Sequence, residues 1–414
     1  MPASQTSCEA GITAYTWLCQ ISLPFMSHHP VCEELPPHAD AVIIGGGIVG
    51  AATAFYTSRA GLDTVVVEMR DALGSLATAA SAGTFRALFD QPEVVALVQA
   101  SIEVYAHLAD TVGLPEIDIG FHQQGYLFAS SEPNGLEALG ARVAHKHSIG
   151  LDDVELLDGD EARYRFPYLA PQVTAAIYRA GDGWLSPHQV TYGFAAGSGA
   201  RFLLSTRATG IRLDGRGVCG VETNCGAIRT RAAVIAAGAF APRVAATMGL
   251  DLPLDIVRLQ QVVLQPQPFI PQDAPVTVDW TTGSYWRPEV GGALLGWSDP
   301  FAPNEEPAEE VAADWQFPAL ALEQTMGTTP FWQEVAENLK GDQVTVTAGQ
   351  VSYPYDNKPV LGPVPGFDGL FANAGHSFGV MVAPASGRFV AETITGDRPG
   401  AENLFGYERL AVHA

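Results

Sequence analysis

Three glycines at a characteristic spacing are the clearest sign of chemistry in this sequence. Gly45, Gly47 and Gly50 fill a G-x-G-x-x-G pattern, and Glu68 follows about 20 residues later. In such a pattern the first glycine permits a tight turn, the second lets the backbone approach a pyrophosphate, and the third lets a helix pack on a strand. A carboxylate at the position of Glu68 accepts hydrogen bonds from a ribose hydroxyl, so a 2′-phosphate, and hence NADP, is disfavoured. The pattern therefore predicts a dinucleotide site, without separating FAD from NAD.

The residues around the glycines predict the strand, helix and strand that must position them. Residues 41–44 and 64–67 are apolar runs typical of buried parallel strands, and residues 48–60 carry small and apolar side chains at helical spacing. The amino end of that helix would point free N–H groups at the phosphates. The alternative is a glycine-rich turn in an ordinary α/β unit, but the agreement of all these parts favours the nucleotide site. We expect four flanking residues to contact the nucleotide as well: Ile48, Val49, Met69 and Arg70.

Length and charge limit the classes of protein to which the chain could belong. Its 414 residues exceed the usual size of a single core, so two domains are expected. A formal net charge of −23 argues against binding to nucleic acid and to anionic membrane surfaces. No stretch is long and apolar enough to predict a membrane span. We interpret one acidic cluster as a solvated loop face; it comprises Glu305, Glu306, Glu309, Glu310 and Asp314.

The cysteines and the amino-terminal residues bear on the cellular location. The five cysteines form no Cys-x-x-Cys motif and no Cys/His zinc spacing, so we expect reduced thiols, a cytoplasmic protein and no metal site. Cys219 and Cys225 flank a predicted hairpin and are interpreted as incidental. Residues 1–37 lack the basic start of a signal peptide and are expected to be a poorly ordered extension, with Met26 as an alternative start.

Strands of the nucleotide-binding kind recur along the chain. Residues 232–238 are a third buried run that ends in glycine, and residues 369–396 have the pattern of strand, glycine loop and helix. A different, β-rich pattern interrupts these segments twice. The sequence therefore predicts an α/β fold in which a discontinuous nucleotide-binding domain receives a second domain as an insertion. We place the first domain at residues 38–115, 168–250 and 345–414, and the second at residues 116–167 and 251–344.

Further segments of the chain carry a family resemblance. They are SAGTFRALF at residues 81–89, DGWLSPHQV at 182–190, AAVIAAGAFAPRV at 232–244, YWRPEVGGALLGW at 285–297, and the run from YDNKPVLG to ETITG at 355–396. Together with residues 42–68 they resemble the D-amino-acid oxidase superfamily of FAD-dependent amine oxidoreductases, which includes glycine oxidase, sarcosine oxidase, and sarcosine and dimethylglycine dehydrogenases. The resemblance covers roughly residues 38–400. It implies a Rossmann-like FAD-binding domain with an inserted α+β substrate domain built on a mainly antiparallel sheet.

The resemblance implies FAD as the cofactor and assigns further residues to its site. In the family the carboxyl-terminal glycine loop lies beside the isoalloxazine ring, and the segment after residue 80 runs along the flavin. The end of the third strand lies beneath the cofactor, and the backbone at residue 208 meets the adenine. The residues so implied are Ser81, Gly83, Thr84, Ala208, Ala237, Gly238, Gly375, His376, Phe378, Gly379, Val380 and Met381.

Departures from the sarcosine oxidase branch change what the resemblance implies. Val351 stands where a cysteine tethers the flavin, so the FAD is expected to be non-covalent. Met381 stands where a lysine helps oxygen to react, so slow oxidase chemistry is expected. Ser298 aligns with a histidine near the substrate, and the arginine that holds the substrate carboxylate in glycine-oxidase relatives also falls at Val351. These departures leave the substrate open.

Four residues are candidates for binding and converting the substrate: Arg86, Tyr285, Arg287 and His376. Arg86 is our first choice for holding an anionic group, and its alternative is a surface salt bridge. Tyr285 and Arg287 begin a strand that lines the substrate cavity in relatives; the alternatives are a core tyrosine and an outward arginine. His376 is expected near the flavin ring, with a purely structural role as its alternative.

The expected reaction is oxidation of a C–N bond in an amine or amino acid to an imine. The resemblance implies glycine, sarcosine, proline or a larger derivative as the substrate, and oxygen or an external acceptor as the sink for electrons. Two alternatives stay open: an FAD enzyme of specialised metabolism that acts on a larger cyclic substrate, and a flavin-binding subunit without its own turnover. The oligomeric state is also left open.

Overall fold

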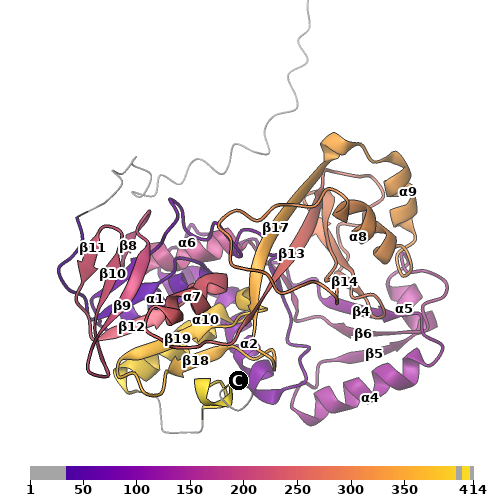
Figure 1. Ribbon diagram of the computed structural model, residues 1–414. Coiled ribbons are helices and arrows are strands. Elements are labelled where there is room, and N and C mark those ends of the chain that lie inside the picture. Colours follow the sequence, from indigo (N-terminus) through magenta and orange to yellow (C-terminus); the bar gives the residue numbers. More distant parts are fainter. Residues whose placement is uncertain (1–33, 398–402, 411–414) are drawn as a thin grey trace, which may run out of the picture.

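Two large β-sheets organise the part of the chain that the computed structural model describes, residues 34–397 and 403–410. Figure 1 shows them in two lobes, with the long strands β13 (Asp255–Leu264) and β17 (Val344–Tyr353) running between the lobes. Of the predicted extension at residues 1–37, residues 1–33 lie outside the described part.

The first sheet has six strands in the order β18-β19-β12-β1-β2-β8. Neighbouring strands are parallel except β18 and β19, which are antiparallel. Strands β1 and β2 are buried along their whole length, because both faces of the sheet are covered. The strands are β1 (Ala41–Ile44), β2 (Thr64–Val67), β8 (Arg201–Leu203), β12 (Ala232–Ile235), β18 (Val360–Pro363) and β19 (Leu370–Ala374).

Alternate residues of the parallel strands belong to two cores, one on each face. Ile43, Val66 and Val234 pack with helices, whereas Val42, Val65 and Ala233 pack with a three-stranded sheet and a short helix. The helices of the first face are α1 (Ile48–Arg59), α2 (Pro92–Ala106), α3 (Leu108–Val112), α6 (Pro187–Gly197) and α10 (Gly379–Thr395). The second face carries β9 (Ala208–Asp214), β10 (Gly217–Thr223), β11 (Gly226–Ile228) and α7 (Ala241–Ala246).

The second sheet has eight strands in the order β17-β13-β16-β15-β14-β4-β6-β5. All its neighbouring strands are antiparallel except β14 and β4, so the predicted mainly antiparallel sheet is confirmed. Helices α8 and α9 pack on it around the buried Trp286 and Trp332. The remaining elements are β4 (Tyr126–Ser130), β5 (Glu155–Asp158), β6 (Ala175–Arg179), β14 (Val276–Asp279), β15 (Tyr285–Glu289), β16 (Gly292–Gly296), α4 (Gly135–Ser148), α5 (Gly159–Arg165), α8 (Phe317–Thr325), α9 (Phe331–Asn338), and a two-stranded pair, β3 (Thr84–Phe85) with β7 (Gly183–Trp184).

Two strands differ from the predicted domain boundaries. Strand β6 was expected in the nucleotide-binding domain, but it lies between β4 and β5 in the eight-stranded sheet. Strand β17 was also expected there, but it pairs with β13 along its whole length, from Val344 to Tyr353. Both assignments are corrected here, since the pairing partners of a strand are distant in sequence and its local composition does not reveal them.

Two further expectations bear on the setting of the chain. Cys219 is a free thiol and Cys225 is disulfide-bonded, so the expectation of reduced thiols is wrong for Cys225. Within the described residues, no helix combines the length and the apolar composition needed to cross a bilayer.

Candidate cofactor and active site

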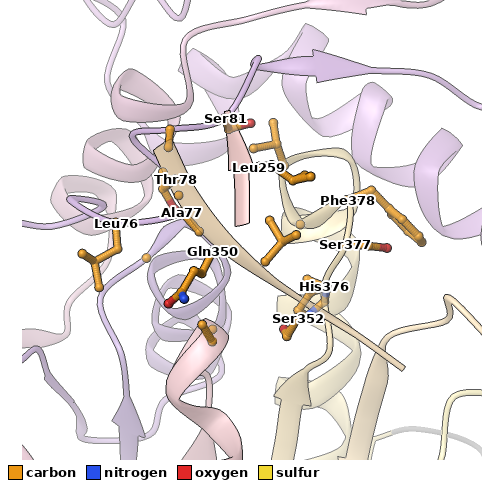
Figure 2. Close-up of a pocket in the computed structure, with 18 of the residues that line it drawn as sticks. Leu76, Ala77, Thr78, Ser81, Leu259, Gln350, Ser352, His376, Ser377 and Phe378 are labelled. Atoms are coloured by element: carbon orange, nitrogen blue, oxygen red, sulfur yellow. The ribbon is translucent and has the colours of Figure 1, made fainter. Parts of the chain in front are cut away.

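A cavity of about 1380 Å³ extends from the glycine turn after β1 to the eight-stranded sheet. Figure 2 shows how its walls come from distant parts of the chain: Thr78 and Ser81 on one side, Gln350 and Ser352 on β17, and His376 in the carboxyl-terminal loop. Drug-sized ligands typically occupy about 300–1,000 Å³. The cavity therefore has room for a ligand larger than a typical small metabolite.

The three motif glycines serve different physical needs. Gly45 has a φ of +115°, and a Cβ there would lie 2.4 Å from the carbonyl oxygen of Ala236. A Cβ on Gly50 would lie 1.9 Å from the carbonyl oxygen of Gly45, so only glycine lets α1 pack this closely on the turn. Gly47 differs, because the nearest atom to its added Cβ would be the Thr78 hydroxyl at 3.3 Å. A Cβ on Gly47 would therefore be a tight fit against one side-chain hydroxyl and would meet no backbone, and Gly47 itself lines the cavity, as backbone that approaches a phosphate should.

Glu68 is almost fully buried directly after β2, and its side chain contacts the backbone of the glycine turn. Its Oε2 accepts a hydrogen bond from Gly46 N at 2.6 Å, and its Oε1 accepts one from Arg70 N at 2.8 Å. Burial raises the pKa of Glu68, while these backbone donors and nearby arginines oppose that shift. Each carboxylate oxygen has a second lone pair, so the residue still has capacity to accept a ribose hydroxyl.

Most of the predicted site residues line this one cavity. From the nucleotide motif they are Gly45, Gly47, Ile48, Val49, Glu68 and Met69, and from the resemblance they are Ser81, Thr84, Ala208, Ala237, Gly238, His376, Phe378, Gly379, Val380 and Met381. Arg86 and Tyr285 line it too, as do Val351 and Ser298. The structure therefore brings the segments that carry the resemblance to a common space.

Five predicted residues lie outside the lining, each for an identifiable reason. Gly50 packs against the backbone of Gly45. Gly83 and Gly375 have φ values of +68° and +69°, so they form turns next to residues that do line the cavity. The Arg70 side chain is directed to an ion pair with Glu309. The fifth is Arg287, which is buried on β15.

Arg287 is buried outside the cavity lining, and its Nε and Nη1 atoms are engaged by protein. Its Nε donates to the carbonyl oxygen of Ala82 at 2.9 Å, and its Nη1 donates to the carbonyl oxygen of Pro288 at 3.0 Å and pairs with Glu289. Burial lowers the pKa of Arg287, while Glu289 opposes that shift. This placement corrects the expected catalytic role: Arg287 anchors the segment at Ala82 to β15.

Arg86, by contrast, lines the cavity with part of its guanidinium available. It lies 4.5 Å from the ring centre of Phe89 and less than 6 Å from those of Tyr126 and Phe128. Nη1 donates to the carbonyl oxygen of Leu88 at 3.0 Å. No carboxylate among residues 34–397 and 403–410 pairs with it, so the predicted alternative of a surface salt bridge does not describe its surroundings. Nε and Nη2 form the other edge of the guanidinium, with the Tyr126 side chain nearby.

The segment that carries Arg86 is itself held by a buried carboxylate. Asp182 Oδ1 accepts a hydrogen bond from Ala87 N at 3.0 Å and pairs with Arg179. Burial raises the pKa of Asp182 to about 6, although Arg179 and the Ala87 amide act against the shift. This contact fixes the backbone next to Arg86.

His376 is neutral and held in one tautomer. Its Nε2 lies 2.8 Å from Asn373 Oδ1, and Asn373 Nδ2 donates to Thr53 Oγ1 at 2.9 Å. If the Asn373 amide oxygen accepts this bond, as its Nδ2 contact with Thr53 favours, Nε2 is the donor; Nδ1 has no partner among the described residues. Burial lowers the pKa of His376 to about 4, so the ring is uncharged at neutral pH.

Several lining residues were missed by sequence reasoning. Thr78 Oγ1 accepts a hydrogen bond from Ile48 N at 3.2 Å, which satisfies an amide at the start of α1. Gln261 and Gln350 are buried on β13 and β17, and Gln261 donates to the carbonyl oxygen of Ala80 at 2.5 Å. Glutamines are seldom buried in proteins, so a glutamine within a long strand was the sign in the sequence that could have indicated these lining residues.

The glycine turn and the carboxylate of Glu68 lie at one end of the cavity, and the eight-stranded sheet forms its other end. This arrangement defines a dinucleotide-binding protein of two-domain architecture. Residues 40–393 match the family of FAD dependent oxidoreductases known as DAO, and the chain belongs to that family. The cofactor of this family is FAD, and the turn, Glu68 and the size of the cavity fit it.

Individual relatives share a quarter or slightly more of their residues with this chain. Mouse mitochondrial dimethylglycine dehydrogenase is 26% identical over 385 residues, which cover 88% of this chain and 43% of that protein. Glycine oxidase of Pseudomonas aeruginosa is 28% identical over 374 residues, covering 86% of this chain and 95% of that protein. The crystal structure of L-proline dehydrogenase from P. horikoshii superposes with a TM-score of 0.81 at 25% identity, covering 91% of this chain and 99% of that one. This chain thus spans less than half the length of the dimethylglycine dehydrogenase.

Proposed function

We propose that this protein is an FAD-dependent oxidoreductase that oxidises a C–N bond of an amine or amino acid to an imine. The observation that carries the proposal is a single cavity with the nucleotide turn at one end and a cationic, aromatic-walled region around Arg86. The names of its relatives, a dimethylglycine dehydrogenase, a glycine oxidase and an L-proline dehydrogenase, point to substrates in which carbon is bonded to nitrogen.

The chain's own residues would bind FAD and orient the substrate. FAD, when bound, supplies the acceptor for a hydride. The turn at Gly45–Gly47 and the carboxylate of Glu68 would hold its nucleotide half, and residues 376–381 would flank its reactive half. The edge of Arg86 would hold an anionic substrate group through two parallel hydrogen bonds. Burial raises the pKa of Tyr285, so this residue offers a hydroxyl and stays uncharged.

Two lining residues bear on how the flavin is attached and reoxidised. Val351 lines the cavity and has no sulfur with which to form a thioether, which supports non-covalent FAD. Met381 also lines the cavity and offers no positive charge to stabilise developing superoxide, which supports slow reaction with oxygen. We propose an external acceptor as the faster partner.

An anaerobic reduction screen tests the proposed reaction. The holoprotein is mixed without oxygen with small amino acids, their N-methyl derivatives and larger cyclic amines, and bleaching of the flavin absorbance is recorded. Bleaching by an amine or amino acid, with an imine-derived product, supports the proposal. Bleaching by larger cyclic compounds alone would favour specialised metabolism, and a flavin that no compound bleaches would favour a binding subunit without turnover.

The cytoplasmic location stays a prediction. The cysteines no longer support this location, because Cys225 is disulfide-bonded and disulfides persist mainly in oxidising compartments.

A further inference from the structure

The segment between β16 and α8 contacts both lobes of the protein, and four residues of its middle part line the cavity. They are Pro307, Ala308, Glu309 and Val311, and Pro307 is buried. We call residues 304–311 the acidic segment. The predicted solvated loop face is borne out, since Glu306, Glu309 and Glu310 are exposed, but three glutamates of the cluster also have arginine partners: Glu305, Glu306 and Glu309.

The start of the acidic segment is fixed to the eight-stranded sheet. Asn304 Oδ1 accepts a hydrogen bond from Ile256 N, and Glu305 N donates to Ile256 O, both at 2.7 Å. Gln350 on β17 donates to Glu305 Oε2 and to Glu306 O, each at 3.0 Å, and accepts from Ala308 N at 2.8 Å. Its backbone is therefore held where it leaves the sheet.

The far part of the acidic segment pairs with arginines of the nucleotide-binding side. Glu309 lies 2.7 Å from Arg207, just before β9, and 3.6 Å from Arg70, just after β2. Glu306 lies 3.1 Å from Arg243 on α7. Arg207 and Arg243 line the cavity themselves, beside Met69 and Ala208. These pairs join the two lobes at the end of the cavity that carries Glu68.

We propose that the acidic segment is part of the FAD site and that its ion pairs with Arg70, Arg207 and Arg243 control the release of bound FAD. The segment covers the nucleotide end of the cavity, where Glu68 and Ala208 are placed to meet the adenosine. FAD can leave this end only when the pairs separate and the segment moves. The segment is thus a cofactor-retaining element whose strength depends on salt, because its pairs are partly exposed.

The rate at which FAD leaves the holoprotein tests the proposal. The protein is diluted with an excess of a flavin-binding scavenger, and release is followed by flavin fluorescence at low and at high sodium chloride. Each exposed ion pair is worth roughly a factor of 1.5 to 5 in an equilibrium constant, so Glu309→Gln should speed release about 2- to 25-fold at low salt. High salt should speed release from the unaltered protein and have a smaller effect on the variant.

Glu310→Gln is the matched control. Glu310 is the next residue, is exposed, and has no ion pair among the described residues, so the same change of charge should leave release unaltered. Because the exposed pairs are weak, the melting temperature of the Glu309→Gln apoprotein should fall by only a few degrees relative to Glu310→Gln, so that faster release reports cofactor retention and not unfolding. Equal release rates for Glu309→Gln and Glu310→Gln would overturn the proposal.

A charge exchange gives a second, independent test. Glu306→Arg places two like charges together and should speed release, and adding Arg243→Glu should restore much of the original rate. If the double variant releases FAD as fast as the single variant, the pair between Glu306 and Arg243 does not retain the cofactor.

Discussion

Replacing Arg86 with alanine should weaken turnover far more than it disturbs FAD binding. The Nη1 atom already donates a hydrogen bond to Leu88 O, so a carboxylate would bind at the edge formed by Nε and Nη2. Losing one partner of a buried charge pair costs about 2–5 kcal/mol. Arg86 is only half-buried, which places the cost near the lower bound, about 2–3 kcal/mol, or about 30- to 150-fold in kcat/KM.

The assay is steady-state turnover of the best substrate from the anaerobic screen, with an artificial electron acceptor and with FAD content measured for each sample. Arg86→Lys should recover only part of the loss, because an ammonium cannot form two parallel hydrogen bonds. Arg142→Ala is a suitable control: Arg142 also stacks on an aromatic ring, that of Trp280 at 4.9 Å, but it does not line the cavity. Near-normal kcat/KM in Arg86→Ala, or a best substrate without an anionic group, would refute the reasoning.

The remaining predictions concern the flavin. Gly47→Val should fold but purify without FAD, since the new Cβ meets only the Thr78 hydroxyl at 3.3 Å and the larger side chain enters the phosphate space; a yellow variant would contradict this. Acid precipitation should leave the flavin in the supernatant, because Val351 cannot tether it, and flavin in the pellet would show a covalent bond elsewhere. Met381→Lys should speed reoxidation of the reduced protein by air, measured as recovery of the flavin absorbance. Hydrogen peroxide formed rapidly by the unaltered protein would contradict the role given to Met381.

The nucleotide end of the site could be predicted from the sequence because its parts are close together in the chain. Gly45, Gly50 and Glu68 act within one strand, helix and strand unit, so their spacing carries the geometry. His376, in the loop before α10, was placed by the family resemblance and not by spacing, and it lines the same cavity. Their surroundings could not be predicted, such as the amide of Asn373 that fixes the His376 tautomer.

The failures share one physical cause, which is pairing across long sequence separations. Arg287 shares a strand with Tyr285, but Ala82 and Glu289 occupy its donors below the cavity. The acidic cluster is an exposed loop as expected, but its partners were not predicted: Glu309 pairs with Arg70 and Arg207, far away in the chain. Local composition describes the charge of a segment and does not reveal what neutralises it.

The distribution of charge around the cavity bears on the proposal that a protein with a net charge of −23 holds an anionic substrate group. Arg207 is paired with Glu309, and Arg243 with Glu306. Asp90, also in the lining, is paired with Lys146. Among the described lining residues, Arg86 is the arginine that no carboxylate neutralises. The lining arginine without an ion pair therefore lies at one wall, beside Phe89 and Phe128. That wall would fix the anionic end of a substrate and so determine which of its carbon atoms faces the flavin.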